Sequence, residues 1–296
     1  MIEYKRICPN CGKEIFYKYK STKDYAEKKN SLCRNCGTYK RASKERQGDL
    51  SILLEDNSES FYWIGFLLAD GHFDKNRLSI TISYKDINHL KKFGNYIKYT
   101  GEYKIKNCFF NDKEFKECSL DIQDSKIIPL INQKFDINTN KTLNPPKTIL
   151  KWNRKLILSL FAGFIDGDGS ITKKNNRKDA FLRIQIHKSW INILKEFNTL
   201  FDKNFTYINN RDYASINISD FPCIRKLKEE LLNLNLPILS RKWDNIDINY
   251  INKIERGKII RPLIKEDYKN GLTRKEITLK YNISYSLLTK ILKYDK

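Results

Sequence analysis

Two related segments of nine residues constrain this chain more than any other feature. They are residues 63–71, WIGFLLADG, and residues 161–169, FAGFIDGDG. Each is an apolar run that ends in Asp-Gly and carries small residues four positions apart. These small residues are Gly65 and Ala69, and Gly163 and Gly167. Residues four apart share one face of a helix. Because glycine inside a helix costs about 1 kcal/mol relative to alanine, we predict that the two faces compensate by packing closely on each other.

The acid near the end of each segment carries the chemistry. Asp70 and Asp168 fall in the last turn of the predicted helices, and we expect Gly71 and Gly169 to form left-handed caps after them. An acid at a helix C-terminus opposes the helix macrodipole. If the helices pack in parallel, the two carboxylates also face each other and need a cation. A hard divalent ion such as magnesium, which prefers oxygen ligands, is the expected one.

This pattern resembles the LAGLIDADG homing endonucleases, in the single-chain form with two motif copies. In that family the penultimate acid of each motif binds the divalent metals that cut DNA, and Asp70 and Asp168 occupy those positions. The copies are 98 residues apart, a suitable length for one αββαββα repeat. The first copy departs from the motif at Trp63, Ile64 and Leu68, which are packing positions. The alternative is two buried helices that end in Asp-Gly by chance.

The resemblance covers about residues 60–250 and implies an α+β fold. In it, two pseudo-symmetric αββαββα repeats form a saddle, and the chain is a monomer. We predict five segments: a zinc-binding module at 1–40, a basic linker at 41–59, a first repeat at 60–150, a second at 151–257 and a helix-turn-helix module at 258–296.

The charge of the chain indicates its partner. A formal net charge of +21 predicts a polyanion, and double-stranded DNA is favoured over a membrane surface. No apolar run approaches the roughly 18 residues of a membrane span, and the N-terminus lacks the apolar core of a signal peptide. We therefore expect an intracellular, cytoplasmic protein, encoded by a bacterium or phage rather than belonging to an organelle, without disulfides.

Four cysteines near the N-terminus have the spacing of a structural metal site. Cys8 and Cys11 form one C-x2-C turn, and Cys33 and Cys36 form another after 21 residues. Two such turns complete a closed tetrahedral zinc site, so we predict structural Zn2+ here. About forty residues cannot bury enough surface to fold alone, and the metal would supply the missing stability. A redox dithiol is the less favoured alternative.

Alternating strands in each repeat indicate surfaces for DNA. The resemblance implies that the concave face of the saddle lies in the major groove, where outward side chains read base edges, arginine pairing with guanine and glutamine with adenine. The candidates are Ser79, Thr81 and Ser83, and then Arg183, Gln185, His187 and Arg211. Ordinary solvated side chains are the alternative reading. A metal-binding or general-base role for His187 is disfavoured, because the family uses hydrated metals.

A basic residue follows the last helix of each repeat. Lys141 and Lys242 resemble the family's lysines near the scissile phosphates, where a cation would stabilise the pentacovalent phosphate. Arg241 is an alternative to Lys242. A plain phosphate contact is the alternative to a catalytic role.

Residues 258–296 resemble a helix-turn-helix. We predict a helix at 261–269, a capping box formed by Thr273 and Glu276, and a recognition helix at 284–293. Its side chains available to DNA would be Tyr285, Ser286, Thr289 and Lys290. An ordinary packed helical hairpin is the alternative.

Together these features predict a site-specific homing endonuclease. It would make a double-strand break in a long, pseudo-palindromic DNA site by Mg2+-dependent phosphodiester hydrolysis. Two alternatives stay open: an intron-splicing maturase on the same scaffold, which would bind RNA, and a DNA-binding regulator that does not cut.

Overall fold

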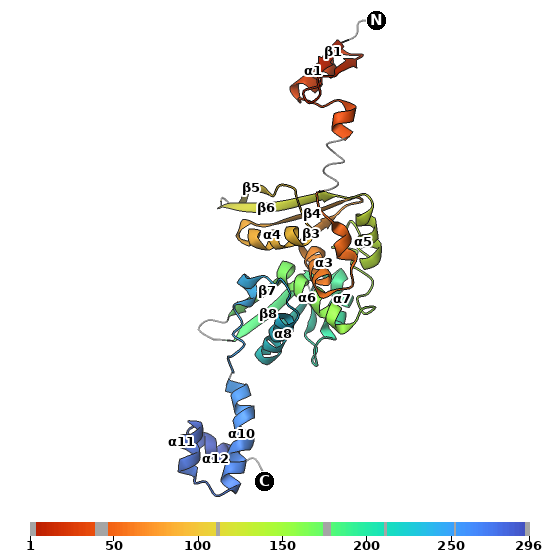
Figure 1. The fold of residues 1–296 in the computed structure, drawn as a ribbon. Helices are drawn as coiled ribbons and strands as arrows, with labels where there is room; N and C mark the ends of the chain where they lie inside the picture. The colour runs from red at the N-terminus through yellow and green to blue at the C-terminus, as the bar shows by residue number, and fades with distance from the viewer. Residues whose placement is uncertain are drawn as a thin grey trace.

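The computed structural model describes residues 4–38, 47–110, 113–173, 179–209, 212–251 and 253–293. Figure 1 shows a central body, with the N-terminal segment and the C-terminal helices extending from opposite ends of it. The N-terminal segment pairs β1 (Tyr4–Ile7) with β2 (Glu14–Tyr17) in an antiparallel hairpin, followed by α1 (Lys20–Lys28). A short 3-10 helix, η1 (Leu50–Leu54), precedes the central body. The predicted linker residues 41–46 lie outside the described residues.

The first half of the central body follows the order αββαββα. Its sheet is antiparallel with strand order β3-β4-β6-β5. The elements are α3 (Ser58–Asp70), β3 (Gly71–Phe73), β4 (Arg77–Ser83), the 3-10 helix η2 (Tyr84–Asp86), α4 (Ile87–Tyr96), β5 (Lys104–Phe110), β6 (Lys113–Gln123) and α5 (Ile127–Phe135).

The second half repeats this order. Its sheet is also antiparallel, with strand order β7-β8-β10-β9. The elements are α6 (Arg154–Asp168), β7 (Gly169–Lys173), β8 (Ala180–His187), the 3-10 helix η3 (Lys188–Trp190), α7 (Ile191–Asn198), β9 (Thr206–Asn209), β10 (Tyr213–Ile218) and α8 (Phe221–Asn233). The predicted α+β class and the order of elements in both repeats are therefore confirmed.

The two motif helices, α3 and α6, lie at the centre of this body (Figure 1). Asparagine caps start both: the side chain of Asn57 accepts from the backbone N–H of Ser60, and that of Asn153 accepts from Leu156. Most of their residues are buried. A helix that is apolar all round is stable only inside a core, so the repeats must enclose them.

Close packing of the motif helices depends on glycine. A Cβ atom at Gly65 would lie 1.9 Å from the carbonyl oxygen of Leu160, and one at Gly163 would lie 1.8 Å from that of Tyr62. Each glycine thus presses against the backbone of the other helix. The predicted packing of the two glycine faces is confirmed.

The expected left-handed caps are absent from both motif helices. Gly71 has φ −74° and Gly169 has φ −79°, and both are extended. They open strands β3 and β7 directly, without a turn. Glycine is still required, because a Cβ at either position would lie 2.5 Å from the carbonyl oxygen four residues earlier, that of Leu67 or Ile165.

Two separate cores support the chain beyond its N-terminal segment. One continuous core runs from Leu50 to Ile246 through both repeats. After α9 (Ser240–Trp243) come α10 (Lys253–Lys269), α11 (Arg274–Tyr281) and α12 (Tyr285–Lys293). These last three helices have a small core of their own, made of Ile264, Ile277, Leu288 and Ile291.

Helix α10 begins earlier than the sequence indicates. It starts at Lys253 rather than at residue 261 and contains Pro262 in its interior. Its first turn is held from outside the helix, since Arg225 of α8 pairs with Glu255 at 2.7 Å. Proline is best tolerated in the first turn of a helix, which is why Pro262 indicates a later start.

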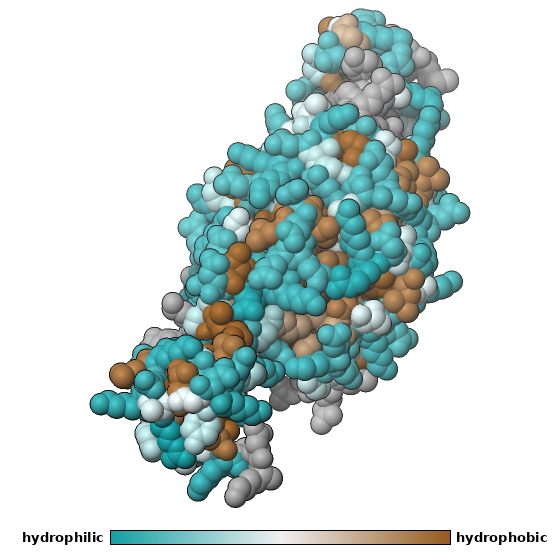
Figure 2. Space-filling view, turned by 60° about the horizontal axis from the view of Figure 1, so that its bottom comes forward, coloured by the Kyte–Doolittle hydropathy of each residue, from teal (hydrophilic) through white to brown (hydrophobic). Residues whose placement is uncertain are grey.

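The surface is largely polar on the face seen in Figure 2, where hydrophobic residues form scattered patches. Within the described residues, every helix is too short or too polar to traverse a lipid bilayer.

Candidate active site

Asp70 and Asp168 end the two motif helices side by side. Asp70 is half-buried and Asp168 is more exposed. The carboxylate of Asp70 lies against the end of α6, because a Cβ at Gly167 would be 3.3 Å from its Oδ2 atom. The two acids thus come from different repeats and meet at one place.

Burial disfavours the charged state of both acids. Burial and then the charge of Asp168 raise the pKa of Asp70 to about 6, although Lys242 and Lys141 oppose the rise. Burial also raises the pKa of Asp168. Two carboxylates at two negative helix ends form an oxygen donor set that fits a hard divalent cation.

The two predicted lysines occupy equivalent places at the C-terminal ends of the motif helices. Lys141 donates to the carbonyl oxygens of Leu68 and Ala69 at 2.5 and 2.6 Å. Lys242 donates to the equivalent carbonyls of the second motif, those of Asp166 and Gly167, at 2.6 and 2.9 Å, and to that of Ile165 at 2.9 Å. Each ammonium therefore caps one motif helix beside its acid, and burial lowers the pKa of both lysines.

Arg241 has a different partner. Its Nε and Nη2 atoms donate to the two carboxylate oxygens of Asp86 at 2.8 and 2.7 Å. Lys242, and not Arg241, is thus the structural counterpart of Lys141. With three carbonyl contacts, the ammonium of Lys242 has all its protons directed at the helix end.

A buried network around Asp166 is not evident from the sequence pattern. Its carboxylate accepts from the hydroxyl of Tyr62 at 2.6 Å, from the indole of Trp243 at 2.7 Å and from the backbone N–H of Leu239 at 2.8 Å. Burial raises the pKa of Asp166 to about 6. The network ties α3, α6 and α9 together. The one clue in the sequence is that the first motif has Leu68 at the equivalent position.

The strand registers place the predicted DNA-contacting residues on the outer sheet faces. In the first sheet Leu78, Ile80 and Ile82 are buried, and the alternate residues face outward. These outward residues are Ser79, Thr81 and Ser83. In the second sheet Arg183 and Gln185 are exposed and hydrogen-bonded to each other, and His187 is half-buried. Arg211 lies outside the described residues.

The outer faces also hold residues that the sequence analysis did not single out. Tyr213 is paired with His187 across the second sheet and is exposed. On the first sheet Arg77 forms a bidentate pair with Asp121. Both residues of this pair lie on the outer face with Ser79, because Ser79 is directly opposite Asp121.

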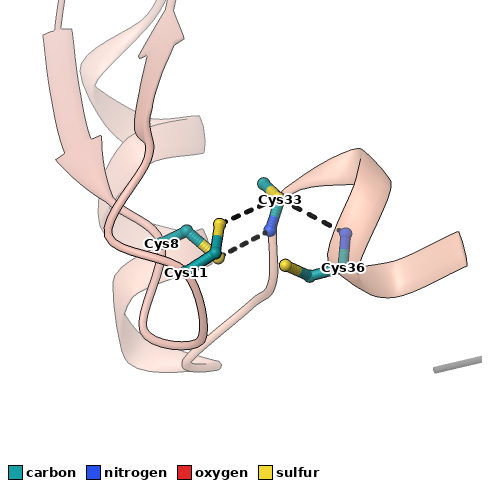
Figure 3. Close-up of side chains that lie close together, drawn as sticks. All are labelled: Cys8, Cys11, Cys33 and Cys36. Carbon is teal, nitrogen blue, oxygen red and sulfur yellow. Dashed lines mark hydrogen bonds between the residues drawn. The ribbon is translucent and has the colours of Figure 1, made fainter. Parts of the chain in front are cut away.

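The four N-terminal cysteines converge as the spacing predicts (Figure 3). Their sulfur atoms all lie within 4.8 Å of one another, and the Cys11 and Cys33 sulfurs are 3.7 Å apart. Tetrahedral zinc with Zn–S bonds of about 2.3 Å would place its sulfurs roughly 3.8 Å apart. A backbone N–H from Cys33 lowers the pKa of Cys8 to about 6, and one from Cys36 lowers that of Cys33. Although a hydrogen bond from Asn10 opposes the rise, the thiols of Cys11 and Cys33 raise the pKa of Cys36 to about 12. The convergence of the four sulfur atoms is the observation that fits a cation bound by thiolates.

The C-terminal helices expose three of the four residues that we predict to contact DNA. The capping box is confirmed, with Thr273 and Glu276 bonded reciprocally at the start of α11. On α12, Tyr285, Ser286 and Lys290 are exposed and Thr289 is half-buried, where it donates to the Tyr285 carbonyl. Leu287 on the same helix is 40% exposed.

No protein-family model matches the sequence, and no curated protein matches it. Several solved structures do match the fold. The homing endonuclease I-WcaI bound to its DNA recognition sequence is 16% identical, with a TM-score of 0.49 over 80% of this chain and 96% of that one. The meganuclease I-SmaMI bound to uncleaveable DNA is 16% identical, with a TM-score of 0.47 over 67% and 95%. The LAGLIDADG meganuclease I-AabMI bound to uncleaved DNA is 15% identical, with a TM-score of 0.41 over 75% and 96%.

Proposed function

We propose that this chain is a site-specific DNA endonuclease of the homing type, acting as a monomer on double-stranded DNA. The observation that carries the proposal is the paired motif-helix end. Asp70 and Asp168 come from two repeats with the same order of elements, and each stands over a lysine that caps equivalent carbonyls. A purely structural helix pair has no need for two acids at its most negative end.

In this proposal the two acids hold Mg2+, which would activate water and stabilise the leaving 3′ oxygen. Lys141 and Lys242 contribute in two ways. They fix the backbone that carries each acid, and their positive charge stabilises the phosphate as negative charge develops on it. Because their protons are directed at carbonyl oxygens, their effect on the phosphate is electrostatic at a distance.

The two sheets would form a saddle over the DNA major groove. Arg183, Gln185 and His187 on the second sheet, and Ser79, Thr81 and Ser83 on the first, would face the bases, and Arg211 is a further candidate for DNA contact. A net charge of +21 supports this proposal, because neutralised phosphates release counterions and favour binding.

The terminal segments would lengthen the footprint. The cysteine cluster of residues 1–40 would bind one structural Zn2+, and residues 258–296 would dock as a helix-turn-helix, with residues 41–59 as the linker. Tyr285, Ser286, Thr289 and Lys290 on α12 would contact DNA. Contacts of this kind add affinity and register more than base specificity.

The test is an in vitro selection of cleaved duplexes from a random library with Mg2+. We expect one family of long, imperfectly palindromic sites. The wild type should cut both strands of these sites, and the Asp70→Asn, Asp168→Asn double variant should cut neither strand. Binding of a duplex without any cutting would indicate the regulator instead. Preferential binding of a structured RNA, with no duplex cut, would indicate the maturase.

A further inference from the structure

A polar cavity opens beside Asp70. Its volume is about 230 Å³, and Thr81, Ser83, Asp86, His89 and Arg241 line it together with Asp70. His89 is buried, and its Nδ1 atom lacks a hydrogen-bond partner among the described residues. The cavity therefore joins one acid of the site to an ion pair, Asp86–Arg241, that the proposed function does not use.

The pseudo-symmetry of the repeats shows that the other half lacks this arrangement. Gly71 pairs with Ile80 across the first sheet, and Gly169 pairs with Ile184 across the second. Counting from these two isoleucines makes Asp86 equivalent to Trp190 and His89 equivalent to Ile193. Trp190 and Ile193 are both buried. An indole thus stands in the second half where the first half has a carboxylate.

The arginine of the Asp86–Arg241 pair is also confined to one half of the molecule. Lys141 and Lys242 are equivalent by their carbonyl contacts, so the residue before each is equivalent too. Arg241 precedes Lys242, whereas Asn140 precedes Lys141. The indole of Trp190 donates to the backbone carbonyl of Lys141 at 3.1 Å and has no guanidinium to hold. One acid therefore has an arginine–carboxylate pair beside it and the other does not.

The geometry of the pair leaves the guanidinium free to bind an anion. Asp86 is 12% exposed and Arg241 is 56% exposed, so the carboxylate is the anchored partner. The pair uses Nε and Nη2 of the arginine. Among the described residues, Nη1 makes no hydrogen bond. A guanidinium fixed in this way is preorganised for a phosphate, because arginine binds phosphate through its planar fork.

We propose that Arg241, oriented by Asp86, binds a phosphate of the DNA strand that is cut beside Asp70, and that the other strand has no such contact. The two strands are then cut by unequal half-sites. This inference rests on the proposed endonuclease function. It makes Arg241 a substrate-binding residue and Asp86 a positioning residue.

The experiment follows each strand of a selected duplex separately, with a different label on each. Arg241→Gln should slow cleavage of one strand by about tenfold to a hundredfold, leave the other within about twofold, and accumulate nicked duplex. Asp86→Asn should slow the same strand, and the double variant should be no slower than Arg241→Gln alone, since interacting residues are not additive. The matched control is Asn140→Ala at the equivalent position, which should leave the ratio of strand rates at the wild-type value.

Equal slowing of both strands by Arg241→Gln, or no slowing of either, would overturn the inference while leaving the proposed function intact. If the wild type cuts no duplex, both this inference and the proposed endonuclease function are wrong. If Arg241→Gln melts early, Arg241→Lys keeps the charge but not the fork and should show the same strand bias. If the Asp86→Asn, Arg241→Gln double variant slows that strand by the product of the two single effects, Asp86 does not act by positioning Arg241.

Discussion

His89 shows how packing around the motif helices sets the charge of a single side chain. The Tyr62 hydroxyl donates to Asp166, so it accepts from the Nε2–H of His89 at 3.0 Å. The Nδ1 atom is then the unprotonated nitrogen. Burial, reinforced by the charge of Lys92, lowers the pKa of His89 to about 3. The imidazole is therefore neutral in the folded chain.

We expect acid to destabilise the fold through this residue. An unfolded histidine has a pKa of about 6.5, so between pH 6.5 and pH 3 the unfolded state binds one more proton. The contribution of His89 to the free energy of unfolding should therefore fall by up to about 1.4 kcal/mol per pH unit as the pH drops through that window. Asp70 and Asp166, whose pKa values are raised to about 6, change the free energy of unfolding in the opposite direction, so the effect of His89 is read from the difference between variants that keep both acids. Urea unfolding at pH 6.5 and pH 5 measures the loss. His89→Gln, which keeps a donor for Tyr62, should lose less stability than the wild type, and the exposed-site control His72→Gln should match the wild type. Equal losses in all three proteins would contradict this account.

For single residues, the sequence pattern indicated which residues come together at a site better than it indicated their hydrogen-bond partners. The motif pattern identified Asp70 and Asp168, and residue spacing identified the four cysteines, because both depend on local order along the chain. The helix-capping role of Lys141 and Lys242 arises from contacts about 75 residues apart in sequence. The Asp166 network and the Asp86–Arg241 pair likewise join distant segments. Spacing alone does not reveal such partners.

At the scale of elements, the contact between α3 and α6 is the most constrained feature of the fold. Gly65 and Gly163 bring the two backbones together, and that approach places the acids side by side. The periodicity of the apolar residues predicted these helices and most strands well. It misplaced the start of α10, which lies at Lys253. The Asp-Gly pattern misjudged the conformation of Gly71, because Gly71 continues directly into β3.

Gly65→Ala should therefore destabilise the central body. Its added methyl would lie 1.9 Å from the Leu160 carbonyl oxygen, and overpacking of this kind typically costs about 1–3 kcal/mol or more. The matched control is Gly257→Ala in α10, where a Cβ meets nothing within 4 Å. That change should stabilise its helix by up to about 1 kcal/mol. Chemical denaturation of both variants gives the comparison. A neutral Gly65→Ala would show that the helices are not in close contact.

For the whole molecule, the terminal segments differ in how they maintain their fold. The N-terminal segment has few buried residues, chiefly Cys8, Ala26 and Cys33, and none belongs to a hydrophobic core cluster. The C-terminal helices pack around four apolar residues of their own. The spacing of the four cysteines predicted their convergence, and the pattern Thr273 to Glu276 predicted the start of α11.

Cys33→Ser should release the metal and unfold the N-terminal segment alone. We expect one zinc per wild-type chain by elemental analysis and none in the variant, with cooperative melting of the central body preserved because its core begins at Leu50. Cys108→Ser, outside the cluster, should keep its zinc. Native protein without metal would refute the zinc site.

Deleting residues 258–296 should weaken DNA binding and shorten the footprint without moving the cut. Loss of three phosphate contacts would reduce the log–log salt slope of binding by about 3, since each contributes about 0.9. Footprinting and binding titrations at several salt concentrations measure both. An unchanged footprint and slope would mean that α10 to α12 do not contact DNA.

If Asp70 and Asp168 form one metal-dependent cutting site, the rate of Mg2+-dependent cleavage of a selected duplex must depend on both of them. Asp70→Asn and Asp168→Asn should each abolish or greatly slow cleavage and leave binding intact. Neither should lower the melting temperature without metal, because burial and mutual repulsion already disfavour the charged acids. Asp74→Asn, at an exposed acid nearby, should cut at the wild-type rate. If either Asp70→Asn or Asp168→Asn cuts both strands as fast as the wild type, the paired-acid site is wrong.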